Sequence, residues 1–134
     1  MIYTSEKHER DFIEKRLDEY NHLHVPITAS PIGFHIKDSI GSVIGGINGI
    51  IYWKKRCLFI TVFWIDEKDR GLGWGSRLLR HMEDEAREKG CQMAHLDTFD
   101  FQAKDFYLKY GYEIFGILDY PDQHTRYYLK KWLT

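Results

Sequence analysis

The stretch C-L-F-I-T-V-F-W-I-D-E-K-D-R-G-L-G-W-G-S-R-L-L-R (residues 57–80) joins an apolar run to an amphipathic run through three closely spaced glycines. The apolar run over 57–65 predicts a buried strand, and the periodicity that follows predicts a helix over 73–89. A strand that passes through glycines into a helix points bare backbone N–H groups outward at the positive end of that helix. The stretch therefore predicts an anion site, and pyrophosphate is the usual occupant of such a site.

Three kinds of phosphate-binding loop compete for this pattern. A P-loop requires G-x-x-x-x-G-K-[ST], and the lysine is missing here. A dinucleotide-binding loop requires G-x-G-x-x-G after the first strand and an acidic residue about 20 positions later. Ser76 stands where the third glycine of that motif belongs, and Cys91 stands about 20 residues further on. The sequence therefore disfavours both a P-loop and a dinucleotide-binding loop, and a third kind of phosphate-binding loop remains.

The third kind of loop belongs to a known family. R-x-x-G-x-G at residues 70–75 resembles the R/Q-x-x-G-x-G/A loop that grips the pyrophosphate of coenzyme A in the GNAT superfamily of N-acetyltransferases. A second block, A-x-x-F-Y-x-K-x-G-Y at residues 103–112, resembles the A-x-x-x-[LF]-Y-x-K-x-G-[FY] segment on that family's last helix. The order of elements also matches, and the resemblance covers residues 32–118 well and the remainder loosely.

The resemblance implies that acetyl-coenzyme A is the co-substrate and that no metal takes part. The strand over 57–65 is then expected to be bulged and splayed from a strand over 91–98, with the pantetheine arm in the cleft between them. Backbone N–H groups near Ile65 would polarise the thioester carbonyl. The residues that the resemblance places at the cofactor are Trp64, Ile65, Arg70, Gly71, Leu72, Gly73, Trp74, Gly75 and Ser76.

Two protons must move in such a reaction, and the resemblance suggests one of the groups involved. It places the hydroxyl of Tyr107 beside the thioester sulfur, where it would act as the general acid for the leaving thiolate. Three residues remain open as the base that takes the proton of an ammonium substrate: Glu67, Asp97 and His95. Asp97 and His95 share one face of their strand, since strand side chains alternate. Asp100 replaces an asparagine that often contacts the cofactor in the family, and a carboxylate cannot donate that hydrogen bond.

The resemblance places acceptor specificity in the N-terminal helix, the hairpin around 41–53 and the final loop. Aromatic and acidic side chains in those segments suit a small cationic amine, through cation–π attraction and ion pairing. We therefore expect an N-acetyltransferase in which a primary amine attacks directly through a tetrahedral intermediate. The alternative is a coenzyme A-binding sensor or interaction module without turnover. The acceptor residues expected are Tyr20, Tyr52, Trp53, Asp119, Tyr120 and Asp122.

Composition bounds the remaining possibilities. A length of 134 residues suits a single domain over 1–134. The 19 basic and 20 acidic residues give a formal net charge of −1, which argues against a nucleic-acid partner. No apolar run is long enough to span a bilayer or to serve as a secretory signal, so we expect no membrane partner and a cytoplasmic location. Cys57 and Cys91 lie in apolar segments and are expected to be reduced core thiols.

The predicted fold class is α/β of the α+β type, a mixed and largely antiparallel sheet of six to seven strands flanked by about three to four helices. The first helix is expected to begin at Ser5 and to bury Ile13, Leu17 and Tyr20. Glu83 and Arg87 stand at ion-pair spacing on the second helix. The final strand offers an edge for a homodimer. Strands are predicted at 1–4, 32–38, 42–53, 57–65, 91–98, 112–118 and 124–133, and helices at about 5–20, 73–89 and 101–110.

Overall fold

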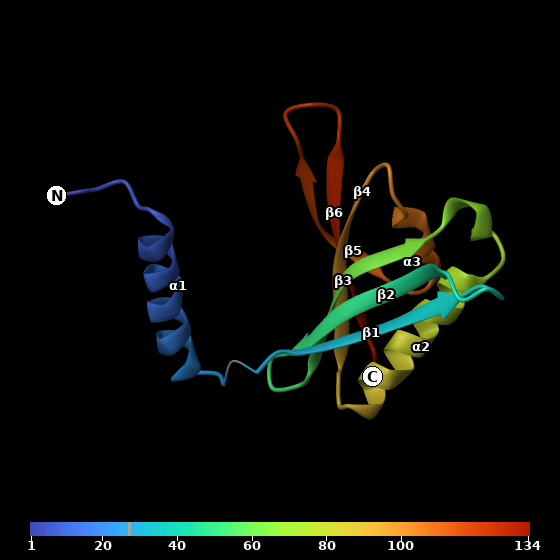
Figure 1. Cartoon of the computed structure of the whole chain (residues 1–134), viewed down its shortest axis with the longest axis horizontal. Coiled ribbons are helices and arrows are strands. Elements are labelled where there is room, and N and C mark those ends of the chain that lie inside the picture. Colours follow the sequence, from blue (N-terminus) through green and yellow to red (C-terminus); the bar gives the residue numbers. More distant parts are fainter. Residues whose placement is uncertain (27) are drawn as a thin grey trace.

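The computed structural model of the chain describes residues 1–26 and 28–134. Its centre is a six-stranded sheet in the order β1-β2-β3-β4-β6-β5, in which neighbours are antiparallel except for the parallel pair β3–β4 (Figure 1). The mixed, largely antiparallel sheet that the sequence predicts is thus confirmed. The strands are β1 (Ser30–Lys37), β2 (Val43–Tyr52), β3 (Cys57–Ile65), β4 (Met93–Phe99), β5 (Glu113–Asp119) and β6 (Thr125–Trp132).

Two of the three α-helices pack on the same face of this sheet. α2 (Trp74–Glu88) and α3 (Lys104–Lys109) contribute to one core, and no described helix covers the opposite face, which we call the open face (Figure 1). α1 (Lys7–His22) stands away from the sheet at the end of a short connection. The most deeply buried side chains of the core are Ile47, Leu58, Leu79, Met82 and Leu129.

The second helix follows its sequence pattern closely, with one exception. It buries Leu78, Leu79, Met82 and Ala86, and Gly90 follows its last residues with a φ of +100°. Glu83, however, is buried and does not pair with Arg87, which bonds Asp84 instead. Its carboxylate accepts hydrogen bonds from the hydroxyl of Tyr112 at 2.8 Å and from the amine of Lys131 at 2.9 Å. A buried carboxylate needs such partners, because desolvation of an unpaired charge is costly.

The third and fourth strands diverge at the point where the sequence predicts a splay. They pair only from Cys57 opposite Met93 to Phe59 opposite His95. The pairing of β3 with β2 then shifts register between Ile60 and Val62, which leaves Thr61 as a bulge. Beyond Phe59, no described strand pairs with the β4-facing edge of β3. The result is a gap in strand pairing that opens from a vertex at Phe59 and His95 toward the end of β3, and we call this gap the β3–β4 cleft.

The glycines of β2 lie where backbone and side chains approach closely. A Cβ on Gly49 would come within 2.9 Å of the Phe59 carbonyl oxygen, and one on Gly45 within 2.7 Å of the Ile65 side chain. Any larger residue would push β3 away from β2. These glycines therefore belong to the packing of the sheet and not to a phosphate loop.

The N-terminal region is where the sequence prediction is wrong. Residues 1–4 form no strand, because they lie exposed with no neighbouring strand to pair with. α1 is capped by Glu6 and not by Ser5, since the Glu6 and Glu9 side chains form a reciprocal capping box. The stripe of Ile13, Leu17 and Tyr20 is about 60% exposed. The amphipathic pattern is present, but no described helix or strand covers it, and Tyr20 contacts the His24 ring just past the helix.

The sequence also predicts that the two cysteines are reduced core thiols and that no segment spans a membrane. Cys57 and Cys91 are both buried and unpaired, as predicted, and burial raises the pKa of each thiol. Among the helices of residues 1–26 and 28–134, none has the length and apolar character needed to cross a bilayer.

Candidate active site

The loop between β3 and α2 is shaped by glycines in the left-handed region. Gly71 has a φ of +78° and Gly73 a φ of +88°, and a Cβ at either position would meet nothing within 4 Å. Glycine is therefore required here by backbone conformation, while the space around both residues stays open. The Arg70 side chain folds back and donates from Nε to the carbonyl oxygen of Ile65 at 2.9 Å, which ties the loop to the end of β3. Leu72 is largely exposed at the tip.

The first turn of α2 presents free backbone donors in a positive environment. Gly73 is the N-cap and offers no side chain to the helix, and Ser76 donates its hydroxyl hydrogen to the Gly73 carbonyl oxygen at 3.1 Å. No acidic residue lies in this turn, and the Arg77 guanidinium sits 4.4 Å from the centre of the Trp74 ring. Helix dipole and arginine charge both favour an anion at this point. A Cβ placed on Gly75 would lie 3.5 Å from the Phe106 ring, so α2 packs closely on α3.

The cleft between β3 and β4 runs from this loop toward its vertex. Ile65 lies six positions after Phe59, which at roughly 3.3 Å per residue gives about 20 Å of strand edge that no described strand pairs with. The side chain of Ile65 packs on the core, and that of Trp64 lies on the open face, 46% exposed. The β4-facing backbone groups of this edge can pair with an extended ligand, as unpaired strand edges do.

Tyr107 lies against the core face of the sheet beside the cleft. Its side chain is 7% exposed, and its ring contacts that of Phe63 at 6.3 Å between centroids. Burial, followed by the nearby negative charge of Asp97, raises the pKa of Tyr107 to about 12. Within residues 1–26 and 28–134 no group is hydrogen-bonded to its hydroxyl. Tyr107 therefore remains protonated at neutral pH with its proton free to be donated.

Asp97 is held by an arginine from the neighbouring strand. Its carboxylate lies 3.0 Å from the Arg126 guanidinium, and the hydrogen bond between them raises the pKa of Arg126. The guanidinium is also stacked near the rings of Phe99 and Tyr128, which fixes its position. This ion pair engages Asp97 and leaves it less available to accept a substrate proton.

His95 occupies the vertex of the cleft on the open face. Its Nε2 shares a hydrogen bond of 2.5 Å with the hydroxyl of Tyr52, and the Phe59 ring stacks on it at 4.8 Å, with the planes 7° apart. Burial lowers the pKa of His95 below its usual 6.5, although the charge of Asp97 opposes the shift. The imidazole is therefore neutral at neutral pH and able to accept a proton.

Glu67 and Asp100 lie apart from this group of side chains. Glu67 is exposed at the start of a short 3₁₀ turn, Glu67–Asp69, and none of its contacts within the described chain joins it to Tyr107, Asp97 or His95. Asp100 directly follows β4 and contacts the ring nitrogen Nδ1 of His124, in the turn between β5 and β6, at 3.2 Å. The structure thus brings two of the three candidate bases together with the candidate acid.

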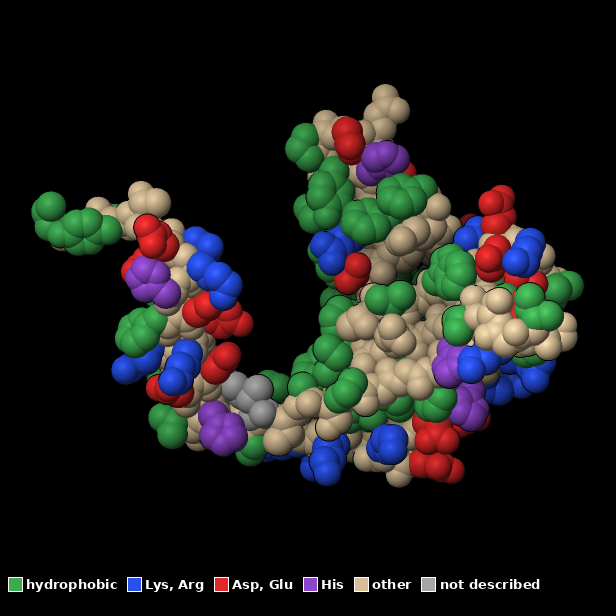
Figure 2. All heavy atoms as spheres, viewed as in Figure 1, with side chains coloured by type: hydrophobic (Ala, Val, Ile, Leu, Met, Phe, Trp, Pro, Cys, Tyr) green, Lys and Arg blue, Asp and Glu red, His purple; other side chains and the backbone are tan. Residues whose placement is uncertain are grey.

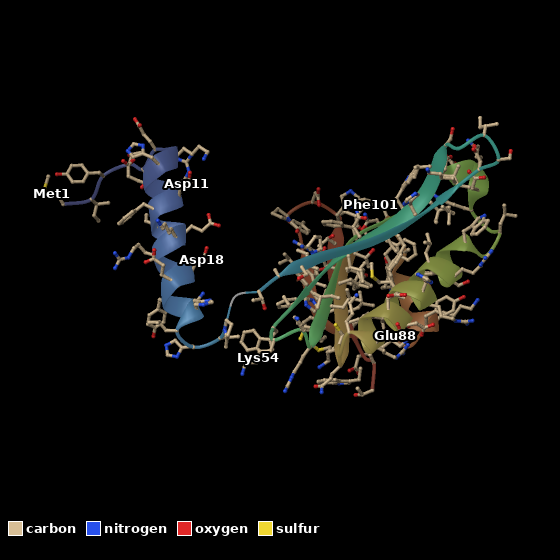
Figure 3. The ribbon with its side chains drawn as sticks, turned by 60° about the horizontal axis from the view of Figure 1, so that its bottom comes forward. Met1, Asp11, Asp18, Lys54, Glu88 and Phe101 are labelled. Atoms are coloured by element: carbon tan, nitrogen blue, oxygen red, sulfur yellow. The ribbon has the colours of Figure 1, made fainter. Side chains whose placement is uncertain are left out.

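A cavity of about 740 Å³ lies beside His95, between the end of α1 and the β2–β3 turn. Two of its walls, Tyr52 and Phe59, are the residues that contact His95. Asp18 from α1 and the half-exposed Trp53 also line it. Figure 3 shows Asp18 on α1 and Lys54 at the β2–β3 turn, between which this cavity lies. The expected acceptor residues Tyr52 and Trp53 therefore meet, together with an acidic group.

The other expected acceptor residues lie elsewhere. Tyr120 packs near Phe99 at the β5–β6 hairpin, Asp119 accepts a hydrogen bond from Thr125, and Asp122 accepts one from the backbone of His124. Tyr20 contacts the ring of His24 without lining the cavity. Asp119, Tyr120 and Asp122 therefore lie together at the β5–β6 hairpin, apart from the cavity.

The sequence analysis missed three residues of this region: Phe59, Asp18 and Arg126. Phe59 gave no signal, because an apolar residue in a strand normally indicates core. Asp18 is one of several charges on an amphipathic helix. Arg126 lies on β6 opposite Phe99, and its pairing with Asp97 crosses 29 residues of sequence.

A match to a family model decides the classification. Residues 2–112 match the model described as the acetyltransferase (GNAT) family, a stretch that includes the glycine loop, the cleft and Tyr107. The chain belongs to the GNAT acetyltransferase family. It is accordingly an acyltransferase, and the reading of the glycine loop as a dinucleotide site falls away.

Individual GNAT relatives agree with this family. Blasticidin-S acetyltransferase of Streptomyces morookaense is 40% identical over 93 residues, covering 68% of this chain and 67% of that protein. An acetyltransferase of Agrobacterium fabrum is 34% identical over 83 residues, covering 62% of this chain and 59% of that protein. The crystal structure of an acetyltransferase from Bacillus cereus superimposes with a TM-score of 0.91 at 33% identity, covering 98% of this chain and 96% of the other. The matches to the first two span about two thirds of the relative or less.

Proposed function

We propose that this GNAT protein transfers the acetyl group of acetyl-coenzyme A to a primary amine of a small cationic molecule. One observation carries the proposal: β3 stops pairing with β4 after Phe59, so one edge of β3 is left unpaired between the side of Tyr107, Asp97 and His95 and the glycine loop that starts α2. A donor with a diphosphate at one end and a thioester at the other fits such an arrangement.

The donor half of the proposal uses backbone groups. The pyrophosphate would accept hydrogen bonds from the N–H groups of residues 73–76, close to Arg70 and Arg77. The pantetheine arm would lie along the free edge of β3, whose length of about 20 Å suits an extended arm. The thioester then reaches the vertex, where a backbone N–H of this edge can stabilise the developing oxyanion.

Catalysis needs one base and one acid, and we assign the first role to His95 and the second to Tyr107. His95, neutral because burial lowers its pKa, takes a proton from the incoming ammonium group. The free amine attacks the acetyl carbon, the C–S bond of the tetrahedral adduct breaks, and the thiolate takes the proton of Tyr107. Two protons leave the nitrogen in all. One replaces the proton that Tyr107 gives to sulfur, and the other passes to solvent.

His95 is preferred over the other two base candidates for reasons of contact. Asp97 is engaged by Arg126, and Glu67 lies exposed on the loop. His95 alone of the three contacts residues that line the cavity, through Tyr52 and Phe59. Tyr52 can pass a proton from the cavity to His95 through their shared hydrogen bond.

The acceptor half rests on the cavity and on the relatives. An ammonium group in the cavity would meet the carboxylate of Asp18 and the rings of Tyr52 and Trp53. The 40% identical relative is named for acetylation of blasticidin S, which makes that compound the first acceptor to test.

The test is release of free thiol from acetyl-coenzyme A in the presence of a panel of amines that includes blasticidin S, polyamines and amino-sugar compounds. We expect turnover with at least one cationic small molecule and an acetylated product of the corresponding mass. Tight binding of acetyl-coenzyme A without turnover on any amine would contradict the proposal and favour a binding module.

Replacement of His95 by glutamine should remove the base and keep a partner for Tyr52. We expect kcat/KM at pH 7 to fall by about 100-fold, within the usual range for loss of a general base. Wild-type kcat/KM should fall as pH decreases through the lowered pKa of His95, below pH 6.5, since protonation blocks the base. This acidic decline should be absent in His95→Gln.

Two further variants separate the candidates. Asp97→Asn retains a partner for Arg126, and Glu67→Gln changes only an exposed loop carboxylate. An acidic decline that persists in His95→Gln and vanishes in Asp97→Asn would assign the base to Asp97. Glu67→Gln should leave the profile unchanged.

A further inference from the structure

No helix or strand within residues 1–26 and 28–134 covers the apolar face of α1. None of the 16 residues of this helix is buried, and Figure 2 shows it as a separate column beside the body of the molecule. A helix of this length is marginal in water by itself and usually depends on packing of one face. The large apolar side chains of this face, each about 60% exposed, are Phe12, Ile13, Leu17 and Tyr20.

The open face of the sheet is the second unpartnered surface. Its side chains alternate with those of the core, so Val62 and Trp64 of β3 project away from α2. Gly33 and Gly46 have no side chains there, and with Val62 and Trp64 they border a hollow of about 410 Å³. A ridge of helix side chains can fill a hollow of this kind. The large exposed side chains of the open face are Val62, Trp64, Phe115 and Trp132.

Two prolines and the end of α1 favour an outlying position of the helix. The residues that precede Pro26 and Pro31 are restricted to extended conformations, which disfavours a sharp return at those points. At the other end, the backbone N–H groups of His24 and Val25 both bond the Asn21 carbonyl oxygen, which continues the direction of the helix.

The same outlying position is present in a related crystal structure. α1 accounts for 16 of the 134 residues, so a superposition that missed it would score at most 118/134, or about 0.88. The TM-score with the Bacillus cereus acetyltransferase is 0.91 over 98% of the chain. An exposed amphipathic helix that stays in place in a crystallised relative indicates that its partner is supplied by another molecule.

We infer that α1 is exchanged between two copies of this chain, so that each α1 packs its apolar face on the open face of the partner's sheet. Such a reciprocal contact closes under two-fold symmetry and requires no other protein. Large side chains bury roughly 150–250 Å² each, so half-exposed residues on both sides amount to about 800 Å² per contact. Two contacts reach about 1,600 Å², the usual size of a stable interface.

If the proposed function holds, the exchanged helix also lies close to the active site. His95 and Asp97 project toward the open face, opposite to Ala94 and Leu96 of the core. The partner's α1 would therefore cover the side of the sheet from which the acceptor reaches the cleft. The expectation that the final strand offers an edge for a homodimer is wrong, because β6 lies between β4 and β5. The inferred homodimer uses the N-terminal helix instead.

The test is the mass of the full chain in solution, measured by sedimentation over a concentration series. We expect about twice the monomer mass of 16.0 kDa. Leu17→Glu and Val62→Glu should each give monomers, since a charge would be buried in the contact. Both residues are more than half exposed in the single chain, so neither change should unfold it, which thermal unfolding verifies. Lys15→Glu, on the opposite side of α1, is the matched control and should remain dimeric.

A mixture of the two monomeric variants distinguishes the geometries. In a mixed pair, the intact α1 of Val62→Glu meets the intact face of Leu17→Glu, so one of two contacts survives. The mixture should therefore be heavier than either variant alone. A monomeric wild type, a dimeric Leu17→Glu, or a mixture no heavier than its components would each overturn the inference. A dimeric Val62→Glu together with a monomeric Leu17→Glu would overturn it as well, and would indicate contact between two α1 helices.

Discussion

Replacement of Tyr107 by phenylalanine is expected to lower kcat by 100-fold or more while KM for acetyl-coenzyme A changes little. The change removes only the hydroxyl, which no described group bonds, and keeps the ring that packs against Phe63. Loss of a general acid typically costs 10²–10⁴ in rate. The measurement is steady-state thiol release with the best acceptor of the panel.

The pH dependence provides a second readout for Tyr107. Its pKa is raised to about 12, so the acid stays protonated throughout the usual assay range. Wild-type kcat should therefore show no alkaline decline below pH 10. Tyr110→Phe, at the end of the same helix, is the matched control and should alter kcat less than twofold. Equal effects of the two substitutions, or a normal kcat in Tyr107→Phe, would remove Tyr107 from the chemistry.

Gly73→Glu is expected to weaken binding of coenzyme A on the order of 100-fold. The new carboxylate would enter the open space where the pyrophosphate is proposed to bind, and like charges about 6 Å apart at a partly exposed site repel by roughly 2–3 kcal/mol. Calorimetry with coenzyme A measures this effect directly.

The backbone strain at Gly73 must be separated from the charge. Gly73→Ala imposes the same cost of a positive φ without the anion, so it should bind coenzyme A much better than Gly73→Glu. Gly90→Glu places the same side chain at another positive-φ glycine, past the other end of α2. Gly90→Glu should bind coenzyme A with the affinity of the wild type. Equal affinities for Gly73→Glu and Gly73→Ala would place the pyrophosphate elsewhere.

The elements around the cleft were predictable because their signals are local. Glycines in the left-handed region, a period of 3.6 over α2 and a run of β-branched and aromatic residues in β3 each act within a few residues. The same 3.6-residue periodicity correctly predicted that α1 is a helix, but it wrongly predicted that the apolar face of α1 is buried. Amphipathicity shows which face of a helix can be buried, and only the tertiary or quaternary structure determines what covers it.

The pairings within the candidate site were beyond local reasoning. Tyr52 and His95 lie 43 residues apart, and the partners Glu83 and Lys131 lie 48 apart. A sequence shows that each of these side chains can pair, but not with which group. Glu83 illustrates the point, since its helical spacing to Arg87 suggested a surface ion pair, whereas the fold buries it.

A crystal structure of the protein with coenzyme A tests the central claim most directly. We predict electron density for the pyrophosphate on the N–H groups of residues 73–76, for the pantetheine arm along the free edge of β3, and for the sulfur within roughly 3–4 Å of the Tyr107 hydroxyl. Density for the cofactor outside the β3–β4 cleft, such as in the hollow between β1 and α2 near Phe34 and His81, would contradict the account.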